Sequence, residues 1–344
     1  MRQVAVLGAG SWGTSLSITF GKNNVEVRLW DHDAVTIENI KKDRENKRYL
    51  PGFAFPDSVH PMFSLEEAIY GVEAIVVAVP SQVMRLLLCK VAESKQIKDW
   101  LSGADKGPIP VWAMVGKGLE SDTGMRMSEI AHEVLGKVVD SGLVVVSGPN
   151  LAVEVARGVP TATVAASDNK EAATTIQSLL MCPTLRVYVN SDVTGVELGG
   201  ALKNVLAIAA GISDALGYGD NTKGAILARG LAEMTRIGTV VGAKKDTFLG
   251  LTGVGDLFAT AASKLSRNYR VGFGLGQGKN LNAILEELGQ VAEGVPTAKA
   301  ALVLAKKYNI EMPLISTISA IIDGELTPFD GVGALMMRAP KEEM

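Results

Sequence analysis

The stretch Val4-Ala5-Val6-Leu7-Gly8-Ala9-Gly10-Ser11-Trp12-Gly13 decides the fold. Its first four residues are apolar and predict a buried strand, and a G-x-G-x-x-G pattern follows directly. A helical segment, Thr14 to Phe20, comes next. A strand, a glycine-rich turn and a helix in this order are the context in which the pattern marks a dinucleotide site.

Each glycine of the pattern has its own task. Gly8 is expected to make the tight turn, Gly10 to let the backbone approach a pyrophosphate, and Gly13 to let helix and strand pack closely. Asp31 lies eighteen residues beyond Gly13, at the end of the second predicted strand, where it is placed to accept hydrogen bonds from the adenosine ribose. Trp12 either covers the cofactor or simply packs, and the pattern does not choose between the two.

Short β-branched runs alternate with helical segments through the first half of the chain. Runs that are apolar on both faces are typical of a parallel sheet covered by helices. The five runs are Val4–Leu7, Val25–Trp30, Ala74–Val79, Pro110–Val115 and Leu143–Ser147. Two more, Thr161–Ala166 and Leu185–Val189, flank a helical segment from Lys170 to Met181 and extend the sheet. We therefore predict an α/β dinucleotide-binding domain of the Rossmann type, a doubly wound parallel sheet, over residues 1–189.

A second, all-α domain is predicted over residues 190–344. The length of 344 residues exceeds what one core usually supports. Stretches rich in Ala, Gly and Leu, such as Gly199–Ala215 and Thr222–Val241, replace the β-branched runs. Small residues of this kind let helices approach closely, so we expect a helical substrate-binding and catalytic domain.

Composition narrows the class of protein. A net charge of −3, with 47% hydrophobic and 21% charged residues, is typical of a globular protein and indicates no nucleic-acid partner. Cys89 and Cys182 have no metal-ligand spacing, so we expect no metal site and interpret both as buried small hydrophobes in a reducing compartment.

The start of the chain and its apolar stretches predict a cytoplasmic protein. Only three residues precede the first predicted strand, which leaves no room for a signal or transit peptide. The longest apolar stretch, Val205 to Ile212, is far shorter than the ~20 residues of a membrane span.

Lys203 is the leading candidate for acid–base chemistry. His32, His60 and His132 have no catalytic setting in the sequence. Lys203 interrupts an otherwise apolar helical stretch, with small or apolar residues three and four positions away on either side. A lysine that is partly desolvated there suits proton transfer near neutral pH, whereas one that reaches water along the helix has no such role.

Two further segments follow predicted strands, where open α/β sheets bind their ligands. Lys117 lies between two glycines after the fourth strand, and is either a ligand contact or a surface-loop lysine. Ser147-Gly148-Pro149-Asn150 follows the fifth strand and offers backbone N–H groups, although alone it is only a turn.

The helical half contains a predicted phosphate-binding loop. Gly253-Val254-Gly255-Asp256-Leu257 precedes an alanine-rich helix, and Ser266-Arg267-Asn268 follows. Arginine, hydroxyl and amide donors together suit a phosphate monoester, and an exposed loop without a ligand is the alternative. We predict that Gly272, Gly274, Gly276 and Gly278 form a loop and not a second nucleotide site, because no strand precedes them.

Taken together, the motifs closely resemble the NAD(P)-dependent glycerol-3-phosphate dehydrogenases of bacteria. The resemblance spans residues 4 to about 330 and rests on seven motifs in order. They are Gly-Ala-Gly-Ser-Trp-Gly from Gly8, Val-Gly-Lys-Gly from Val115, Ser-Gly-Pro-Asn from Ser147, Leu-Lys-Asn from Leu202, Gly-Asp-Leu from Gly255, Ser-Arg-Asn from Ser266 and Val-Ala-Glu-Gly from Val291.

The resemblance assigns roles to particular residues. It implies that Lys203 is the catalytic proton acceptor, that Asp256 orients it, and that Lys117 and Asn204 hold and polarise the C2 oxygen. The implied substrate contacts are Lys117, Gly148, Asn150, Lys203, Asp256, Ser266, Arg267 and Asn268. The implied cofactor contacts are Ser11, Trp12, His32, Lys117, Ala152, Arg267, Val291 and Glu293, beside Gly8, Gly10, Gly13 and Asp31 of the fingerprint.

The resemblance also implies an activity. It is the interconversion of sn-glycerol 3-phosphate and dihydroxyacetone phosphate with NAD(P)(H), which supplies glycerol phosphate for phospholipids. A hydroxy-acid dehydrogenase would need a carboxylate clamp in place of Ser266 to Asn268, and a non-enzymatic dinucleotide sensor would not need Lys203 and Asp256. The sequence leaves the oligomeric state open, with a homodimer as the working expectation.

Cofactor preference is the least determined property. Asn150 stands where bacterial relatives often carry Thr or Ser, a change that keeps the hydrogen-bonding capacity. Asp31 and Asp33 flank His32, where many NADP-using relatives carry basic or neutral groups. A carboxylate at Asp31 favours NAD, whereas His32 can donate to a 2′-phosphate. We predict that NAD and NADP both work, and that Asp31→Ala shifts kcat/KM toward NADPH by about tenfold.

Overall fold

The chain divides into two units, which we describe from a computed structural model of residues 2–104, 107–140, 142–340 and 342–343. The sheet unit comprises residues 1–117 and 126–197, and the helical unit comprises residues 118–125 and 198–344. The chain therefore leaves the sheet unit twice, after Lys117 and after Glu197, and re-enters it at Arg126.

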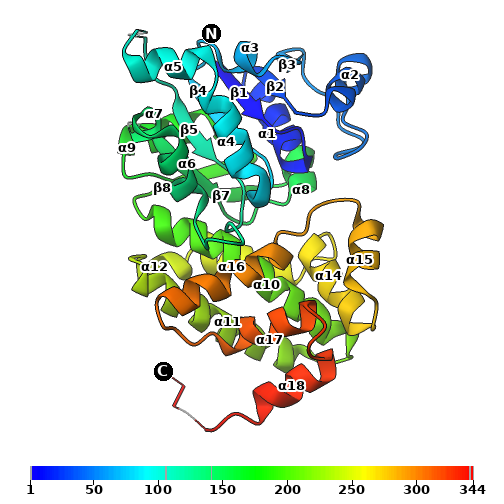
Figure 1. The fold of residues 1–344 in the computed structure, drawn as a ribbon. Coiled ribbons are helices and arrows are strands. Elements are labelled where there is room, and N and C mark those ends of the chain that lie inside the picture. Colours follow the sequence, from blue (N-terminus) through cyan, green and yellow to red (C-terminus); the bar gives the residue numbers. More distant parts are fainter. Residues whose placement is uncertain (1, 105–106, 141, 341, 344) are drawn as a thin grey trace. The chain divides into compact units, whose positions relative to one another are not determined.

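An eight-stranded sheet forms the centre of the sheet unit (Figure 1). Its order is β3-β2-β1-β4-β5-β6-β7-β8, and every neighbouring pair is parallel except β6 and β7. The strands are β1 (Gln3–Leu7), β2 (Glu26–Trp30), β3 (Val59–Met62), β4 (Ala74–Val77), β5 (Val111–Met114), β6 (Leu143–Ser147), β7 (Thr161–Ala166) and β8 (Leu185–Asn190). The predicted Rossmann-type sheet is confirmed.

The sequence did not reveal β3, because Val59-His60-Pro61-Met62 contains a histidine and a proline in place of a continuous apolar run. Proline lacks an N–H for the ladder, so it is tolerated at the edge of a sheet, which is the place of β3. The two halves of the sheet wind in opposite directions from β1 and β4, which are neighbours. Their carboxyl ends form the switch point at which sheets of this type bind ligands.

Two groups of helices accompany the sheet. Helix α1 contacts both α8 and α9, and the helices from α3 to α7 make a chain of contacts of their own. The bounds are α1 (Ser11–Lys22), α2 (Ala34–Asp43), α3 (Leu65–Ile69), α4 (Met84–Ala92), α5 (Lys95–Ser102), α6 (Met127–Leu135), α7 (Lys137–Asp140), α8 (Ala152–Arg157) and α9 (Lys170–Leu180).

The helical unit is built on α10 (Val193–Ala215), which begins in the sheet unit and continues as one helix. The other helices are α11 (Asp220–Val240), α12 (Lys245–Phe248), α13 (Asp256–Ala261), α14 (Arg267–Gly276), α15 (Leu281–Leu288), α16 (Gly294–Lys307), α17 (Pro313–Ile322) and α18 (Pro328–Met336). Helix α10 is longer than the apolar stretch seen in the sequence, and by length and composition it could cross a membrane. Its apolar window is entirely buried in the protein, as in the central helix of a folded domain.

Glycines set the close crossing of α10 and α14. A Cβ on Gly211 would lie 2.1 Å from the carbonyl oxygen of Tyr269, and one on Gly272 would lie 1.9 Å from that of Ile208. The prediction that Gly272, Gly274 and Gly276 form a loop is wrong, because all three lie in α14. These glycines are needed because side chains would clash where α14 packs against neighbouring residues, and they do not mark a turn.

Gly211→Ala is therefore expected to destabilise the protein by about 1–3 kcal/mol, since backbone atoms would have to move to admit the methyl group. Gly333→Ala in α18 is the matched control, because a Cβ there meets nothing within 4 Å. That change should leave stability equal or raise it slightly through helix propensity. Chemical denaturation of both variants checks the difference, and equal free energies of unfolding would contradict it.

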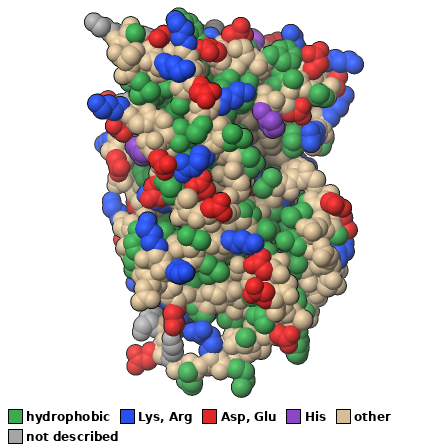
Figure 2. Space-filling model, viewed as in Figure 1, with side chains coloured by type: hydrophobic (Ala, Val, Ile, Leu, Met, Phe, Trp, Pro, Cys, Tyr) green, Lys and Arg blue, Asp and Glu red, His purple; other side chains and the backbone are tan. Residues whose placement is uncertain are grey.

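The cysteine prediction fails for a local reason. Cys89 is exposed, and Cys182 is only partly buried, so neither is a core residue. Cys89 lies in α4 between the buried Leu88 and the exposed Lys90, on the solvent side of an amphipathic helix. On the face in Figure 2, Lys, Arg, Asp and Glu side chains of both signs are interspersed, in keeping with the small net charge.

Candidate active site

The glycine-rich turn after β1 has the geometry that its sequence predicts. Gly8 adopts a φ of 114°, and a Cβ there would lie 2.7 Å from the carbonyl oxygen of Ala78. A Cβ on Gly13 would lie 1.9 Å from the oxygen of Gly8, so α1 can pack on the turn only because Gly13 has no side chain. Gly10 differs from both, because a Cβ there meets no atom within 4 Å. Open space beside this backbone is what the pyrophosphate of a dinucleotide requires.

The first turn of α1 follows this open space. Gly10 is the N-cap residue and contributes no side-chain cap. The Ser11 hydroxyl donates to the carbonyl oxygen of Tyr49 at 2.7 Å. Trp12 packs against the core of the sheet unit, and its indole N–H is buried without a hydrogen-bond partner among the described residues. The residues of the turn thus fit a dinucleotide phosphate at a helix N-terminus.

Asp31 is bound to the same turn. Its carboxylate accepts from the Ala9 N–H at 2.6 Å and from the Asp33 N–H at 3.0 Å. The neighbouring His32 side chain is 84% exposed, with Nδ1 3.0 Å from Asp31. The exposed Arg48 places its guanidinium 3.2 Å from the Asp33 carboxylate. Two acids and two basic groups therefore meet at the end of β2.

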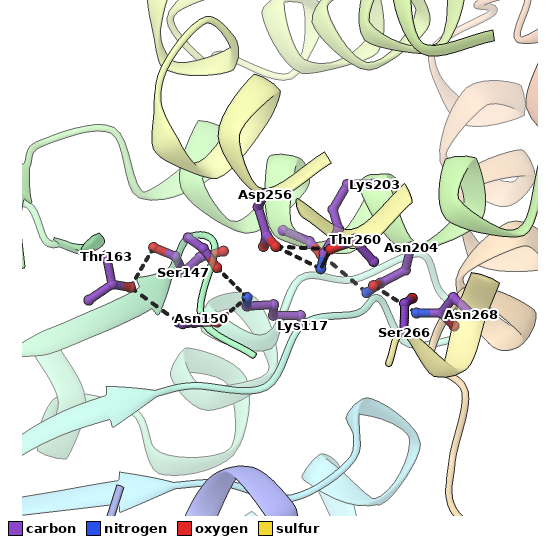
Figure 3. A network of polar contacts seen from close by, with 12 residues as sticks. Lys117, Ser147, Asn150, Thr163, Lys203, Asn204, Asp256, Thr260, Ser266 and Asn268 are labelled. Atoms are coloured by element: carbon purple, nitrogen blue, oxygen red, sulfur yellow. Dashed lines mark hydrogen bonds and ion pairs between the residues drawn. The ribbon is translucent and has the colours of Figure 1, made fainter. Parts of the chain in front are cut away.

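Lys117 and the turn after β6 form one cluster (Figure 3). The Lys117 ammonium donates to the Gly148 carbonyl oxygen at 2.7 Å and to Asn150 Oδ1 at 2.6 Å. Because β5 and β6 are parallel neighbours, the segments after them meet at the same edge of the sheet. The structure therefore brings Lys117, Gly148 and Asn150 together.

Asn150 is held in turn by the antiparallel strand β7. Its Nδ2 donates to the Thr163 hydroxyl at 3.2 Å, and that hydroxyl donates to the Ser147 carbonyl oxygen at 2.9 Å. Gly148, with a φ of 146°, has no room for a side chain, because a Cβ would lie 3.0 Å from Thr163 Cα. Sequence reasoning missed Thr163, since no spacing within the chain indicates that β7 pairs with β6.

Lys203 forms a buried ion pair in the helical unit. Its Nζ lies 2.9 Å from Asp256 Oδ1 and 2.6 Å from the Thr260 hydroxyl, and the lysine is only 5% exposed. Asp256 compensates the charge of the ammonium in this setting. Thr260 also donates to Asp256 at 3.1 Å. Thr260 was missed, although it stands four residues after Asp256 on α13, a spacing that places both on one helix face.

A chain of amides runs beside this pair. Asn204 Nδ2 donates to the Gly200 carbonyl oxygen at 3.2 Å, and Asn204 Oδ1 accepts from Asn268 Nδ2 at 2.8 Å. Asn268 Oδ1 accepts from the Gly294 N–H at 2.9 Å. A Cβ on Gly294 would lie 2.6 Å from the Asn204 carbonyl oxygen, so the start of α16 touches α10. These bonds fix both amides in one orientation.

The predicted phosphate loop is the beginning of α14. Ser266 is the N-cap residue, and its hydroxyl accepts from the Tyr269 N–H at 3.2 Å. The Arg267 side chain is partly exposed to solvent. Desolvation of its guanidinium lowers the pKa of Arg267, and the nearby Glu293 carboxylate opposes this shift only in part. Desolvation and a hydrogen bond to Asp214 raise the pKa of Tyr269 to about 12. Ser266 and Arg267 thus lie at a helix N-terminus, which favours anions.

The remaining predicted cofactor residues are spread over both units. Ala152 begins α8 in the sheet unit, and its carbonyl oxygen accepts from the Ser15 hydroxyl of α1 at 2.9 Å. Val291 is 43% exposed, and Glu293 occupies the N-cap position of α16 in the helical unit.

Two family models match this chain. The model for the NAD-dependent glycerol-3-phosphate dehydrogenase N-terminus matches residues 3–173, and the model for the C-terminus of the same enzymes matches residues 192–332. Curated proteins named "Glycerol-3-phosphate dehydrogenase [NAD(P)+]" are similar over the whole length. The one from Geobacillus kaustophilus is 45% identical, covering 100% of this chain and 97% of its own. The one from Carboxydothermus hydrogenoformans is 44% identical, covering 99% and 98%.

A solved structure of an enzyme with the same name is similar over nearly the whole chain. The crystal structure of glycerol-3-phosphate dehydrogenase from Coxiella burnetii superposes with a TM-score of 0.90 at 35% identity, and the match covers 98% of this chain and 99% of that one. The similarity therefore includes the sheet unit and the helical unit alike.

Proposed function

The chain belongs to the NAD-dependent glycerol-3-phosphate dehydrogenase family, and from that premise we propose that it interconverts sn-glycerol 3-phosphate and dihydroxyacetone phosphate with NAD(H) or NADP(H). The buried pair of Lys203 and Asp256 carries the proposal, because a secondary alcohol can lose a hydride only if its proton has an acceptor. A dinucleotide sensor would gain nothing from an ion pair that is costly to bury.

The proton passes between the C2 oxygen of the substrate and Nζ of Lys203. Asp256 and Thr260 bind that nitrogen and orient it for proton transfer. Reduction of the ketone draws a proton from the ammonium to C2–O, and oxidation of the alcohol returns it. When bound, the nicotinamide supplies or takes the hydride at C2.

Lys117, Asn204 and the α14 N-terminus bind the substrate. Lys117 donates to the Gly148 carbonyl oxygen and to Asn150, and these bonds hold its ammonium at the edge of the sheet, where we propose that it contacts the C2 oxygen. Ser266, Arg267 and Asn268 are proposed to hold the phosphate, with Arg267 donating two parallel hydrogen bonds. The open side of Gly10, the first turn of α1 and the residues Asp31 and His32 are proposed to hold the dinucleotide.

Reduction of dihydroxyacetone phosphate, but not of unphosphorylated dihydroxyacetone, is the expected result of an assay that follows NADH or NADPH at the nicotinamide absorbance band. The remote phosphate supplies binding energy that is used at the reacting carbon. Comparable turnover of the two ketones, or turnover of a 2-hydroxy acid in the reverse direction, would contradict the proposal.

Arg48 is expected to matter for NADPH more than for NADH. Its guanidinium lies 3.2 Å from the Asp33 carboxylate and the side chain is 64% exposed, so it can turn to a 2′-phosphate. Arg48→Ala should lower kcat/KM for NADPH about tenfold relative to NADH. Asp31→Ala should weaken both cofactors in addition to shifting their ratio, because its carboxylate also holds the Ala9 N–H. Steady-state kinetics of both variants with both cofactors test these expectations. An unchanged ratio of kcat/KM for NADPH to kcat/KM for NADH in Arg48→Ala would contradict the role of Arg48.

Family membership supports two further proposals. The curated relatives are bacterial, and we propose that this protein acts in the cytoplasm, where its product supplies glycerol phosphate to phospholipid synthesis. We also propose a homodimer, supported by the exposed apolar side chains of Phe329 and Met336 on α18 and of Met337, its C-cap residue. Light scattering over a range of concentrations tests the dimer.

A further inference from the structure

A buried carboxylate that the proposed chemistry does not use lies at the start of α10. Glu197 Oε1 accepts from the Ser128 N–H at 2.8 Å, and Oε2 accepts from the Ser128 hydroxyl at 2.5 Å and from the Arg126 guanidinium at 2.7 Å. Arg126 also donates to the Ser128 hydroxyl at 3.0 Å. We call Arg126, Ser128 and Glu197 the clasp. It fastens the N-terminus of α6 to the first turns of α10.

The clasp lies within the sheet unit, at two of the places where the chain passes between the units. Arg126 is the first residue after the excursion of residues 118–125, and Glu197 is the last before the chain leaves again. The excursion begins immediately after Lys117, nine residues before Arg126. Lys203 stands six residues beyond Glu197 on the same unbroken helix, or about 9 Å along its axis at 1.5 Å per residue. Both lysines of the proposed site are thus attached to the clasp by short segments.

Stability alone does not account for this arrangement. Burial raises the pKa of Glu197, and the Arg126 charge and the Ser128 donors oppose that rise only in part. Glu197 in this pair is buried and Arg126 is partly buried, with 5% and 18% of their side chains exposed. Buried pairs of this kind are often no more stabilising than apolar residues of the same volume, but their hydrogen bonds fix one geometry. What the clasp contributes is a defined position for α10.

We propose that Glu197 is a positioning residue for the dehydrogenase reaction, and that it acts by fixing α10 against α6 so that the Lys203 amine meets the substrate oxygen. The inference rests on the proposed function. Three donors on one carboxylate restrict both rotation and sliding of α10 at Glu197. A displacement of about 1 Å at a reacting group can cost up to about 10²-fold in rate.

The test compares two isosteric changes at buried carboxylates. Glu197→Gln removes the buried one of the two carboxylate charges, those of Glu197 and Glu129, that pair with Arg126. Glu233→Gln is the matched control, because Glu233 is also buried, at 4% exposure, and its carboxylate likewise accepts from backbone N–H groups, those of Leu314 and Ile315. Both variants are expected to unfold at a lower temperature than wild type. Only Glu197→Gln is expected to lose kcat for dihydroxyacetone phosphate, by about tenfold, with NADH affinity by fluorescence unchanged.

Further variants and outcomes complete the test. Glu197→Asp, which keeps the charge but is one methylene shorter, should recover part of the lost kcat. Equal kcat values for the Glu197→Gln and Glu233→Gln variants would overturn the inference while leaving the proposed function intact, whereas a wild-type protein inactive on dihydroxyacetone phosphate would overturn the function itself. If Glu197→Gln does not fold at the assay temperature, Ser128→Ala takes its place, with an expected fall of about threefold. Failure of both to fold would show that the clasp is purely structural.

Discussion

Lys203→Ala is expected to lower kcat for dihydroxyacetone phosphate by at least about 10²-fold, because the C2 oxygen loses its proton donor. The affinity for NADH should change little, since Lys203 is not among the residues proposed to hold the dinucleotide. The variant also removes the positive charge beside Asp256, which is buried at 2% exposure, so a lower unfolding temperature is expected too. Steady-state kinetics and fluorescence titration of NADH, both below that temperature, separate the effects.

Lys223→Ala is the control for the loss of a helical lysine in an ion pair. Lys223 lies in α11, 2.8 Å from Asp214, and both side chains are partly exposed. Its removal should change kcat by no more than about twofold, because a partly exposed pair contributes little. A Lys203→Ala protein with near wild-type kcat would mean that the lysine is only a structural partner of Asp256.

The sheet and the glycine-rich turn after β1 could be predicted because the information is local. Apolar runs and the glycines that follow β1 are contiguous in sequence, and their spacing alone indicates the strand, the turn and the helix. Features that depend on contacts between distant parts of the chain were not predicted. Strand β3 has no apolar run, and Thr163 reaches Asn150 only because β7 lies antiparallel to β6.

The helical unit shows the same limit. A loop was predicted for Gly272, Gly274 and Gly276, because nothing in the sequence indicates that α10 crosses α14 there. The partners of Lys203 come from fifty-three and fifty-seven residues further along the chain, and only the family resemblance indicated the first of them, Asp256. Lys203 itself was identifiable, because a lysine on an apolar helix face conflicts with the pattern around it.

The substrate phosphate gives the second large effect, at Arg267. Arg267→Ala should raise KM for dihydroxyacetone phosphate about 10²-fold, because two charge-assisted hydrogen bonds are worth about 3 kcal/mol together. The poor activity with unphosphorylated dihydroxyacetone should stay as it is, since that ketone never used the arginine. The ratio of kcat/KM for the two ketones therefore falls in the variant, which a general loss of folding would not produce.

Arg270→Ala serves as the comparison for this experiment. Arg270 is an exposed arginine three residues further along α14 and has not been assigned to the phosphate. Its removal should leave the ratio of kcat/KM for the two ketones unchanged. An anion is most stabilised at the N-terminal residues of a helix, and the Arg270 side chain lies beyond them. If Arg270→Ala lowered the ratio as much as Arg267→Ala, the phosphate would lie along the body of α14 and not at its N-terminus. If neither variant lowered the ratio, the substrate phosphate would be bound by donors elsewhere in the protein. The proposal that Ser266, Arg267 and Asn268 hold the phosphate would then be wrong.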